Sequence, residues 1–553
     1  MKKKYETILE NFIFLSLEVK NQIKLTEEFI NGTNKELIEK MELKDDYIDH
    51  LKTIIEDGCF SYINLADKQE GYEVKAIRSI HIMSVNLERI ADYCENIARQ
   101  TKHLTELSFI KKYRYIPMFD KINYAISKIV TVFKDRDLSG ALEICRAEVD
   151  LDDIYKLNFD EIMEDFEKLN IRKDKQLIQN LITAIFIFRY LERIGDSILN
   201  IGEAIIFSVI GEKIKIRQFE ALEKTLLEST FNGTLTEIDF RAILGSRSGC
   251  YISKINSKKD NKKREQGIFK EGDINKIRKE RDSINLWNKV IPGIAPKVFG
   301  YYEKGDTASL LVEFFHGSPL DQIILCEGYD ILTDAFVILE NTLYKIWMKT
   351  KKDEMLKLTA ISQIKDRFSN ICRVHPTYSR NCKIIESLNI YSSKTLIEEC
   401  AEIENDIYSP FTVLIHGDFN TNNLVFNHKE QKINFIDLYR SKQGDYVQDA
   451  SVFLISNYRL PIFKTKIRNR LNEIIEHFYK FYSSFARQNH DNTYELRMAL
   501  ALARSFYTST RFELDDDFSK DMFLRAHFLM EKILSFKKES LKNFKLPSDV
   551  LYY

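Results

Sequence analysis

The chain has 553 residues, in which 82 Lys and Arg residues are balanced by 83 Asp and Glu residues to give a formal net charge of -1. A single hydrophobic core rarely grows beyond about 250 to 300 residues, so this length predicts more than one domain. The balanced charge supplies no field of one sign for holding nucleic acid or an anionic membrane, so neither is expected as a partner.

The cysteines and the two most apolar segments indicate the compartment. The eight cysteines lie far apart and form no C-x-x-C pair, so we expect them to be reduced. Near the N-terminus, Glu6 and Glu10 interrupt a basic opening, and the apolar run FIFLSL that follows is too short for a signal peptide or a spanning helix. The run LITAIFIF, 181–188, ends at Arg189. The sequence predicts a cytoplasmic protein without a transmembrane segment.

Residues 1–215 are predicted to be all helix. Pro117 is the only proline before residue 290, and apolar residues recur at helical spacing. The segment LERIADYCENIAR, 87–99, repeats as LERIGDSILNIGE, 191–203, at an offset of 104 residues. This part of the chain is therefore interpreted as two copies of a unit with room for three antiparallel helices.

Each copy places acidic residues on one face of a helix. The polar residues of this face are Glu88, Asp92 and Asn96 in the first copy and Glu192, Asp196 and Asn200 in the second. Two acids four residues apart repel by about 0.2 to 0.5 kcal/mol, and a bound hard cation such as Mg, Mn or iron would compensate this repulsion. In the alternative interpretation, Arg89 and Arg193 partly neutralise the acids, which then simply face water.

Two tandem three-helix units that carry E-x-x-x-D resemble PhoU, a phosphate-regulation protein that accompanies phosphate transporters. The resemblance implies a metal, with iron clusters known in some members, and a phosphate transporter or histidine kinase as partner. It extends more weakly to further acids, which are Asp46, Asp49, Asp150 and Asp153. Arg99 stands where the second copy has Glu203, so we expect the first metal site to be the poorer one.

After a connecting segment, 216–231, short β-rich runs separated by turn residues replace the helical pattern, and helices return from about residue 328. This order predicts an α+β region with a first lobe at 232–318 and a second at 319–553. The charged tract SKKDNKKREQ, 257–266, is interpreted as a solvated hairpin turn in preference to a binding segment.

The stretch IHGDFNTNNLVF, 415–426, places polar residues between two apolar runs. A further apolar run, KINFIDLYR, contains Asp437, so Asp418, Asn423 and Asp437 are expected to converge at one rim of a small sheet. Phosphoryl transfer needs such a set, because one carboxylate orients the attacking hydroxyl while an Asn and an Asp hold Mg²⁺ against the phosphates. We expect His416 to orient the loop.

These motifs resemble the aminoglycoside phosphotransferase and choline kinase superfamily, whose members have a bilobal, protein-kinase-like fold. The resemblance implies that Asp418 is the catalytic base and that Asn423 and Asp437 ligate magnesium. The following stretch GDYVQDA, 444–450, matches the family pattern as well. We expect its Asp445 and Asp449 to brace the loop.

The first lobe offers the elements of a nucleotide site in the expected order. QGIFK places Lys270 on a strand, and the next helix carries Glu280, so the lysine can neutralise the α- and β-phosphates while the glutamate holds it. Lys254 and Lys258 are alternatives to Lys270.

A turn with Gly245 and Gly249 is the predicted phosphate loop, although G-x-x-x-G is a weak motif. The segment Glu313 to Phe315 resembles the hinge that offers backbone groups to adenine.

The sequence therefore predicts an ATP- and Mg-dependent phosphotransferase that acts on a hydroxyl of a small molecule and carries a PhoU-like metal-binding regulatory module. The alternative is a non-catalytic regulator, in which the kinase-like part binds nucleotide without turnover. The acceptor pocket is expected within about residues 447–545. The acids at 515–517 could bind a cationic acceptor or form a solvated loop.

Overall fold

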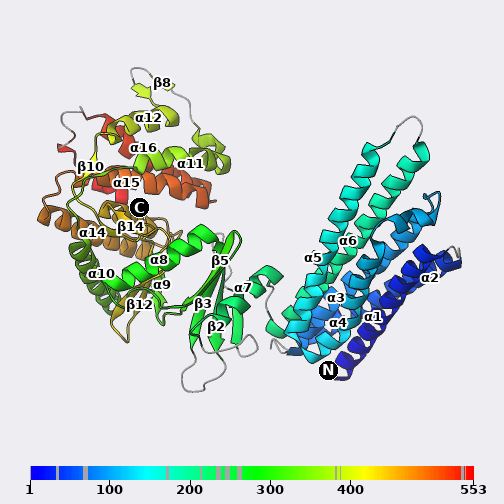
Figure 1. Cartoon of the computed structure of the whole chain (residues 1–553). Helices are drawn as coiled ribbons and strands as arrows, with labels where there is room; N and C mark the ends of the chain where they lie inside the picture. Colours follow the sequence, from blue (N-terminus) through cyan, green and yellow to red (C-terminus); the bar gives the residue numbers. More distant parts are fainter. Residues whose placement is uncertain are drawn as a thin grey trace. The chain divides into compact units, whose positions relative to one another are not determined.

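The computed structural model describes residues 2–32, 36–65, 72–169, 174–211, 214–231, 238–242, 250–257, 265–379, 383–385, 388–536, 541 and 543–553. Its contacts divide the chain into two compact units, the first consisting mainly of Met1–Lys224 and the second mainly of Glu265–Tyr553. Figure 1 shows that the first unit is helical and that the second combines a sheet with many helices. The predicted fold class, an all-α region followed by an α+β kinase-like fold, is confirmed.

The first unit contains six long helices in two successive groups of three. The helices are α1 (Lys2–Asn31), α2 (Glu36–Leu65), α3 (Tyr72–Thr101), α4 (Tyr115–Asp135), α5 (Leu138–Glu167) and α6 (Lys175–Ile210), with a 3₁₀ helix η1 (Leu107–Lys112) between the groups. The repeated LERI segments lie on α3 and α6, which pack against each other. No helix in the described part of the chain is long and apolar enough to cross a membrane.

The apolar residues of each repeat form the core. On α3, Ile90 and Ile97 are fully buried, and on α6, Ile194 and Ile201 are as well. Helix α6 ends at Gly211, whose φ of 87° is left-handed and whose N–H donates to the carbonyl of Phe207 at 2.7 Å. A glycine at this position ends a helix without steric strain.

A five-stranded sheet and one long helix come next in the chain. After α7 (Ile216–Leu227), the strands are β1 (Ile238–Ala242), β2 (Tyr251–Ser257), β3 (Gln266–Asp273), β4 (Val298–Lys304) and β5 (Thr307–Glu313), in the order β1-β2-β3-β5-β4. Strand β5 pairs antiparallel with both β3 and β4. Helix α8 (Ile274–Val290) follows β3 directly. Asp273 caps α8 by accepting hydrogen bonds from the N–H groups of Asn275 and Lys276, so it ends the strand and starts the helix.

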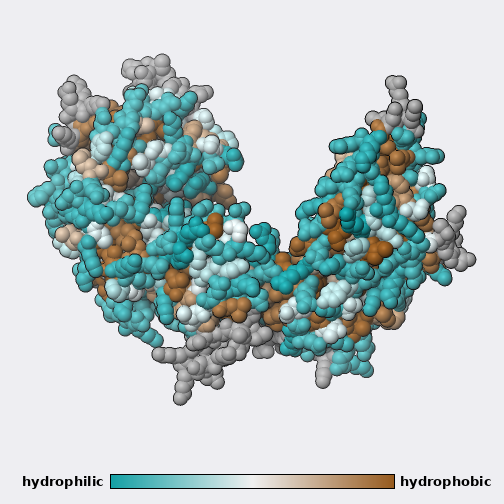
Figure 2. Space-filling model, in the orientation of Figure 1, coloured by the Kyte–Doolittle hydropathy of each residue, from teal (hydrophilic) through white to brown (hydrophobic). Residues whose placement is uncertain are grey.

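The remaining part of the second unit is mostly helical. Its helices are α9 (Leu320–Cys326), α10 (Tyr329–Thr350), α11 (Ala360–Val374), α12 (Ser393–Glu404), α13 (Tyr446–Tyr458), α14 (Thr465–Gln488), α15 (Tyr494–Ser509) and α16 (Asp516–Leu534). Short 3₁₀ helices lie at η3 (Pro376–Tyr378), η4 (Thr421–Asn423), η5 (Thr510–Phe512) and η7 (Ser548–Leu551). The visible face of this unit is largely hydrophilic with scattered apolar side chains (Figure 2).

Small two- and three-stranded sheets complete this part and carry the polar loops. The strands are β6 (Ser318–Pro319), β7 (Leu356–Lys357), β8 (Lys383–Ile385), β9 (Leu388–Ile390), β10 (Tyr408–Ser409), β11 (Val413–Ile415), β12 (Leu424–Asn427), β13 (Lys432–Phe435) and β14 (Lys442–Gly444). Strand β12 pairs antiparallel with β13, and β11 pairs with β14. These pairings bring the loops after β11 and β13 together.

Candidate active site and acidic cluster

His416 connects the two polar loops of the second unit. Its ring Nε2 donates to the carbonyl of Ile436 at 2.9 Å, and its Nδ1 accepts from the N–H of Asp418 at 3.3 Å. These partners require a neutral imidazole with the proton on Nε2. Burial lowers the pKa of His416, against the raising effect of Asp418 and Asp437, which agrees with that form. His416 thus fixes the residue before Asp437 relative to Asp418.

Asp449 holds the turn that precedes Asp418. Its carboxylate accepts from the N–H of His416 at 2.6 Å and from the N–H of Gly417 at 2.8 Å. Burial raises the pKa of Asp449 to about 7, although the two backbone donors favour its charged form. Gly417 has a left-handed φ of 81°, and a Cβ there would lie 2.3 Å from the carbonyl oxygen of Arg440. The turn therefore requires glycine at this position.

Asp418 and Asn423 lie beside each other on the loop after β11. Asp418 Oδ1 accepts from the side chain of Asn420 at 2.7 Å, and Oδ2 lies 3.1 Å from Nη1 of Arg440. The side-chain amide of Asn423 donates to the backbone carbonyl of Asp418 at 2.9 Å. Asn423 is buried, and this donation leaves its amide oxygen free to act as a ligand.

Asp437 lies next to the buried ion pair formed by Lys270 and Glu280. Nζ of Lys270 is 2.5 Å from Oε1 of Glu280 and 3.5 Å from Oδ1 of Asp437. Burial would lower the pKa of Lys270, but the two carboxylates raise it above its ordinary value, so the side chain is charged. The N–H of Ile436 donates to the carbonyl of Asn423 at 3.0 Å, which joins the Asp437 segment to the Asn423 loop.

The other predicted nucleotide contacts are placed as follows. Lys254 lies over the ring of Phe314, 3.5 Å from its centroid, whereas Lys270 contacts Glu280 and Asp437. Gly245, Gly249 and Lys258 lie outside the described residues.

In the predicted hinge, the N–H of Glu313 donates to the carbonyl of Lys297 and that of Phe314 to the carbonyl of Gln266. Phe315 is different, because within the described ranges its N–H has no protein acceptor.

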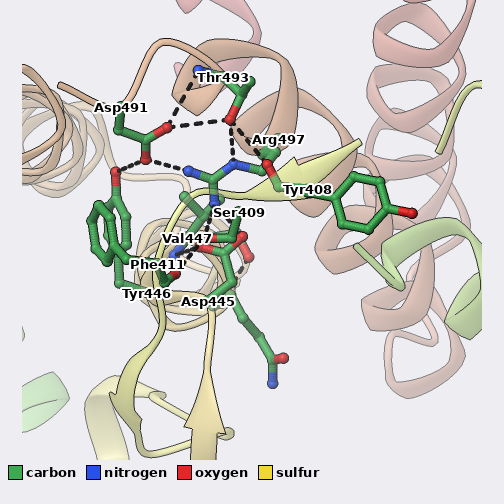
Figure 3. Close-up of polar contacts among 11 residues, drawn as sticks. Tyr408, Ser409, Phe411, Asp445, Tyr446, Val447, Asp491, Thr493 and Arg497 are labelled. Atoms are coloured by element: carbon green, nitrogen blue, oxygen red, sulfur yellow. Dashed lines mark hydrogen bonds and ion pairs between the residues drawn. The ribbon is translucent and has the colours of Figure 1, made fainter. Parts of the chain in front are cut away.

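A buried ion network surrounds Arg497 (Figure 3). The guanidinium forms ion pairs with Asp445 and Asp491 and donates to the hydroxyl of Thr493 at 3.1 Å. Asp445 also caps α13 by accepting from the N–H of Val447. The network joins α13 to α15 and anchors the segment that follows β14.

A cavity of about 650 Å³ opens beside Asp418. It is lined by α8, α11, α13 and α15 and by the segments around Gly417 and Arg440. The acids at 515–517, which the sequence offered for a cationic acceptor, do not line this cavity. Instead, Asp515 accepts from the N–H of Phe518 and caps α16.

In the first unit, the first repeat gathers three carboxylates. Asp49, Glu88 and Asp92 each place a carboxylate oxygen within 4.8 Å of the others. Asp45, on α2, belongs to the same group of acids, which we call the acidic ridge of the first repeat. Burial and the neighbouring acids raise the pKa of Glu88 to about 7 and the pKa of Asp45 to about 7. Such mutual repulsion is what a bound hard cation would relieve, so this donor set fits a metal of the kind expected.

In the first repeat Glu88 lies 3.9 Å from Lys52, whereas the acids of the second repeat pair more closely with arginines. Arg189 contacts Glu192 at 2.6 Å, and Arg193 contacts Asp196 at 3.0 Å. Glu203, expected to improve this site, accepts from the N–H of Ile216 instead. The sequence predicts that the first site is the poorer one, and this stays a prediction; among the described residues, the carboxylate trio lies in the first repeat.

The weaker candidates and the asparagines of the ridges lie as follows. Asp150 pairs with Lys121 at 2.5 Å, Asp153 lies 3.7 Å from Lys156, and Asp46 is exposed. Asn200 donates to the side chain of Asn86 at 3.1 Å, and Asn96 is half-buried on α3.

Two groups of residues at these sites were not identified from the sequence. Asp45 directly precedes the predicted candidate Asp46, and only its burial in the folded chain distinguishes Asp45 from this neighbour. The arginines of the cavity, discussed below, come from separate helices, so no local spacing reveals them.

Comparisons with known proteins agree with this division of the chain. Residues 14–101 and 116–205 match the PhoU domain family, and residues 337–484 match the ecdysteroid kinase-like family. The phosphate-specific transport system accessory protein PhoU homolog of Clostridium acetobutylicum is 27% identical over 191 residues, which are 34% of this chain and 84% of that protein.

Two solved structures resemble separate parts of the chain. A crystal structure of PhoU from Pseudomonas aeruginosa is 20% identical and covers 38% of this chain and 99% of that one, with a TM-score of 0.34. An ethanolamine kinase from Plasmodium vivax is 16% identical and covers 54% and 84%, with a TM-score of 0.33. By the two family matches, the chain carries an N-terminal PhoU domain and a C-terminal ecdysteroid kinase-like domain.

Proposed function

We propose that the chain is an ATP- and Mg-dependent phosphotransferase that phosphorylates a hydroxyl of a small molecule, and that its PhoU domain is a metal-binding regulatory module. The single observation that carries the proposal is the contact of the Lys270–Glu280 ion pair with Asp437, beside the loop that holds Asp418 and Asn423. The kinase-like family match includes this loop. We propose the domains as residues 1–215, a connecting segment 216–231, and lobes at 232–318 and 319–553.

In this proposal each polar side chain has one task. Asp418 accepts the proton of the acceptor hydroxyl, and His416 is a positioning residue that keeps the Asp418 loop in place. Lys270, held by Glu280, neutralises charge on the α- and β-phosphates, and the free N–H of Phe315 is the hinge donor for adenine. Glu313 contributes to the same hinge.

The residues present fit a magnesium ion. Asn423 keeps its amide oxygen free, and Asp437 presents a carboxylate 3.5 Å from Lys270. When bound, the ion supplies charge neutralisation for the terminal phosphates. Hard cations prefer such oxygen ligands.

The PhoU domain is proposed to bind a hard metal such as iron or manganese through Asp49, Glu88 and Asp92. The trio geometry and the raised pKa of Glu88 support this site. Glu192 and Asp196 could join a second site only if their arginine partners moved away. Proteins named PhoU accompany phosphate-specific transport systems, so a phosphate transporter or its histidine kinase is the partner we propose.

The experiment compares the parent chain with Asp418→Asn across a panel of alcohols, sugars and aminoglycosides with ATP and Mg²⁺. We expect the variant to lose about 10²- to 10⁴-fold in transfer rate, the range of general base catalysis, while its affinity for ATP is unchanged. Asp516→Asn, at an exposed position, is the matched control. Equal turnover by the variant contradicts the role of Asp418, and nucleotide binding without turnover by the parent supports a non-catalytic regulator.

A further inference from the structure

The cavity beside Asp418 is strongly cationic. Its charged lining consists of eight cations, among them Arg367, Arg440, Arg504 and Arg511, and one carboxylate, that of Asp418. The whole chain has a net charge of -1, so this concentration of one sign is local. A cavity of this size suits a small molecule.

Arg504 on α15 is the most buried of these cations, with 6% of its surface exposed. Its guanidinium donates only to uncharged groups, the side chains of Gln363 at 3.3 Å, Ser451 at 3.1 Å and Ser505 at 2.9 Å. Its Nε has no hydrogen-bond acceptor among the described groups. A charge this buried is normally paired, yet among the described residues no carboxylate lies within 4 Å of the Arg504 guanidinium.

Arg367 on α11 and Arg511 on η5 also lie away from carboxylates. Within the described ranges, neither has a carboxylate within 4 Å, and Nε of Arg511 is buried without an acceptor. The guanidinium of Arg511 lies 4.4 Å from the ring centroid of Phe512.

Neighbouring cations of the cavity raise the electrostatic energy of each of the three arginines. Burial and then Arg367 lower the pKa of Arg504 to about 10. Burial and then Arg367 and Arg440 lower the pKa of Arg511, and burial and Arg440 lower the pKa of Arg367. The charges of Asp366, Asp418 and Asp449 oppose these effects only in part. An anion between the three guanidinium groups would remove this repulsion.

The triphosphate of the nucleotide does not explain these cations. Lys270 and Asp437, the proposed phosphate contacts, are not part of the cavity lining. Arg367, Arg504 and Arg511 lie on α11, α15 and η5, which carry none of the proposed nucleotide contacts. They line the same cavity as Asp418, the proposed base.

We propose that the acceptor is a small hydroxyl compound that carries an oxyanion group, a phosphate or a carboxylate, bound by Arg367, Arg504 and Arg511 while its hydroxyl faces Asp418. The guanidinium fork matches both oxyanions in a bidentate geometry. This inference rests on the proposed phosphotransferase function, because it names the acceptor class of the same site.

The test uses the full-length chain with ATP, Mg²⁺ and matched acceptors. Glycerol, ribose and glucose are each compared with their phosphate monoesters and with the corresponding acids, so that only the oxyanion differs. We expect kcat/KM to be about 100-fold higher for a charged member than for its neutral parent, which is the effect of two charge-assisted hydrogen bonds. Preference for the phosphate or for the carboxylate identifies the oxyanion.

Arg367→Gln and Arg511→Gln then locate the binding group. We expect each to raise KM for the charged acceptor by about tenfold or more without changing KM for ATP. Arg373→Gln is the matched control, because this exposed arginine lies on α11 outside the cavity. Higher kcat/KM for neutral or cationic acceptors, or a KM that these variants leave unchanged, overturns the proposal.

A binding measurement separates failure of this inference from failure of the proposed function. Inorganic phosphate is titrated into the parent chain and into the Arg367→Gln/Arg511→Gln variant by calorimetry. We expect binding to the parent and at least tenfold weaker binding to the variant. Phosphate binding of this kind without transfer to any acceptor contradicts the phosphotransferase function and leaves the oxyanion site in place. Equal binding by both chains, or by neither, overturns the oxyanion site.

Discussion

Gly417 illustrates how one residue type fixes the position of the proposed base. Its φ of 81° strains any side chain, and an added Cβ would lie 2.3 Å from a backbone oxygen that cannot move freely. We therefore expect Gly417→Ala to lower the free energy of unfolding by about 1 to 3 kcal/mol and to abolish transfer, because the Asp418 loop shifts. Urea unfolding and the ATP turnover assay measure the two effects.

Gly328→Ala is the control for this change. Gly328 has a φ of -68° and no atom near the position of an added Cβ, so alanine there should leave stability and turnover close to those of the parent. If Gly417→Ala behaves like Gly328→Ala, the loop does not need the left-handed turn.

The Arg497 network shows how helices far apart in the sequence hold the loop segment. Arg497 is fully buried between Asp445, which caps α13, and Asp491, which also accepts from the hydroxyl of Tyr446 at 2.7 Å. Arg497→Met leaves two buried carboxylates without a cation, which costs about 3 to 5 kcal/mol. We expect this loss in chemical denaturation, with reduced turnover because α13 carries Asp449.

Arg487→Met tests whether charge removal alone has this effect. Arg487 is exposed near the end of α14, and among the described residues its guanidinium donates only to the nearby Ser484 side chain, at 3.2 Å. Its replacement should change the free energy of unfolding by less than about 0.5 kcal/mol. A similar small change for Arg497→Met would mean that the network contributes little to stability.

The acidic ridge of the first repeat makes a prediction about pH. The pKa of Asp45 and the pKa of Glu88 are each about 7 in the folded chain, above the ordinary values of 3.8 and 4.5. The folded state therefore binds more protons, so without metal the stability that these groups contribute falls as the pH rises from about 4 to about 7. A metal must displace these protons, so we expect Mn²⁺ affinity to weaken by about tenfold per unit as the pH falls below 7.

Calorimetric titration at pH 6, 7 and 8 measures this affinity. Glu88→Gln should weaken Mn²⁺ binding at pH 8 and make it less dependent on pH, because one titrating ligand is removed. Asp46→Asn is the control, since Asp46 is an exposed acid on α2. Affinity that is independent of pH in the parent, or lost equally in Asp46→Asn, would place the metal elsewhere.

The sequence revealed the features that local spacing encodes. The LERI repeat located α3 and α6, and the apolar runs around IHGDFNTNNLVF located β11 and β12. It did not reveal which acids pair closely with arginines, because only the folded geometry shows the contacts of Arg189 and Arg193. The cavity arginines were also missed, because α11 and α15 meet only in the folded chain.

The fusion of the two domains leads to the last prediction, that the PhoU domain regulates the kinase-like domain. A shortened chain should begin at Ile216, so that it keeps the contacts of Thr225 with Ser309 at 2.6 Å and of Thr230 with the carbonyl of Phe299 at 2.9 Å. We expect this chain to retain ATP turnover at constant Mg²⁺. In the full chain, added iron(II) should change turnover by about fivefold or more, a typical coupling between sites.

A full-length chain with Glu88→Gln and Asp92→Asn distinguishes metal that acts at the acidic ridge from metal that acts on the kinase-like domain itself. If metal on the ridge biases the kinase, this variant and the shortened chain both lose the response to iron(II), because neither can bind metal there. If all three chains respond equally, the metal acts at the magnesium site and the domains are joined without coupling. A ligand shifts an equilibrium only if it binds the two states with different affinity. Coupling between two sites is also reciprocal, so a real response requires the affinity for iron(II) to change when ATP binds.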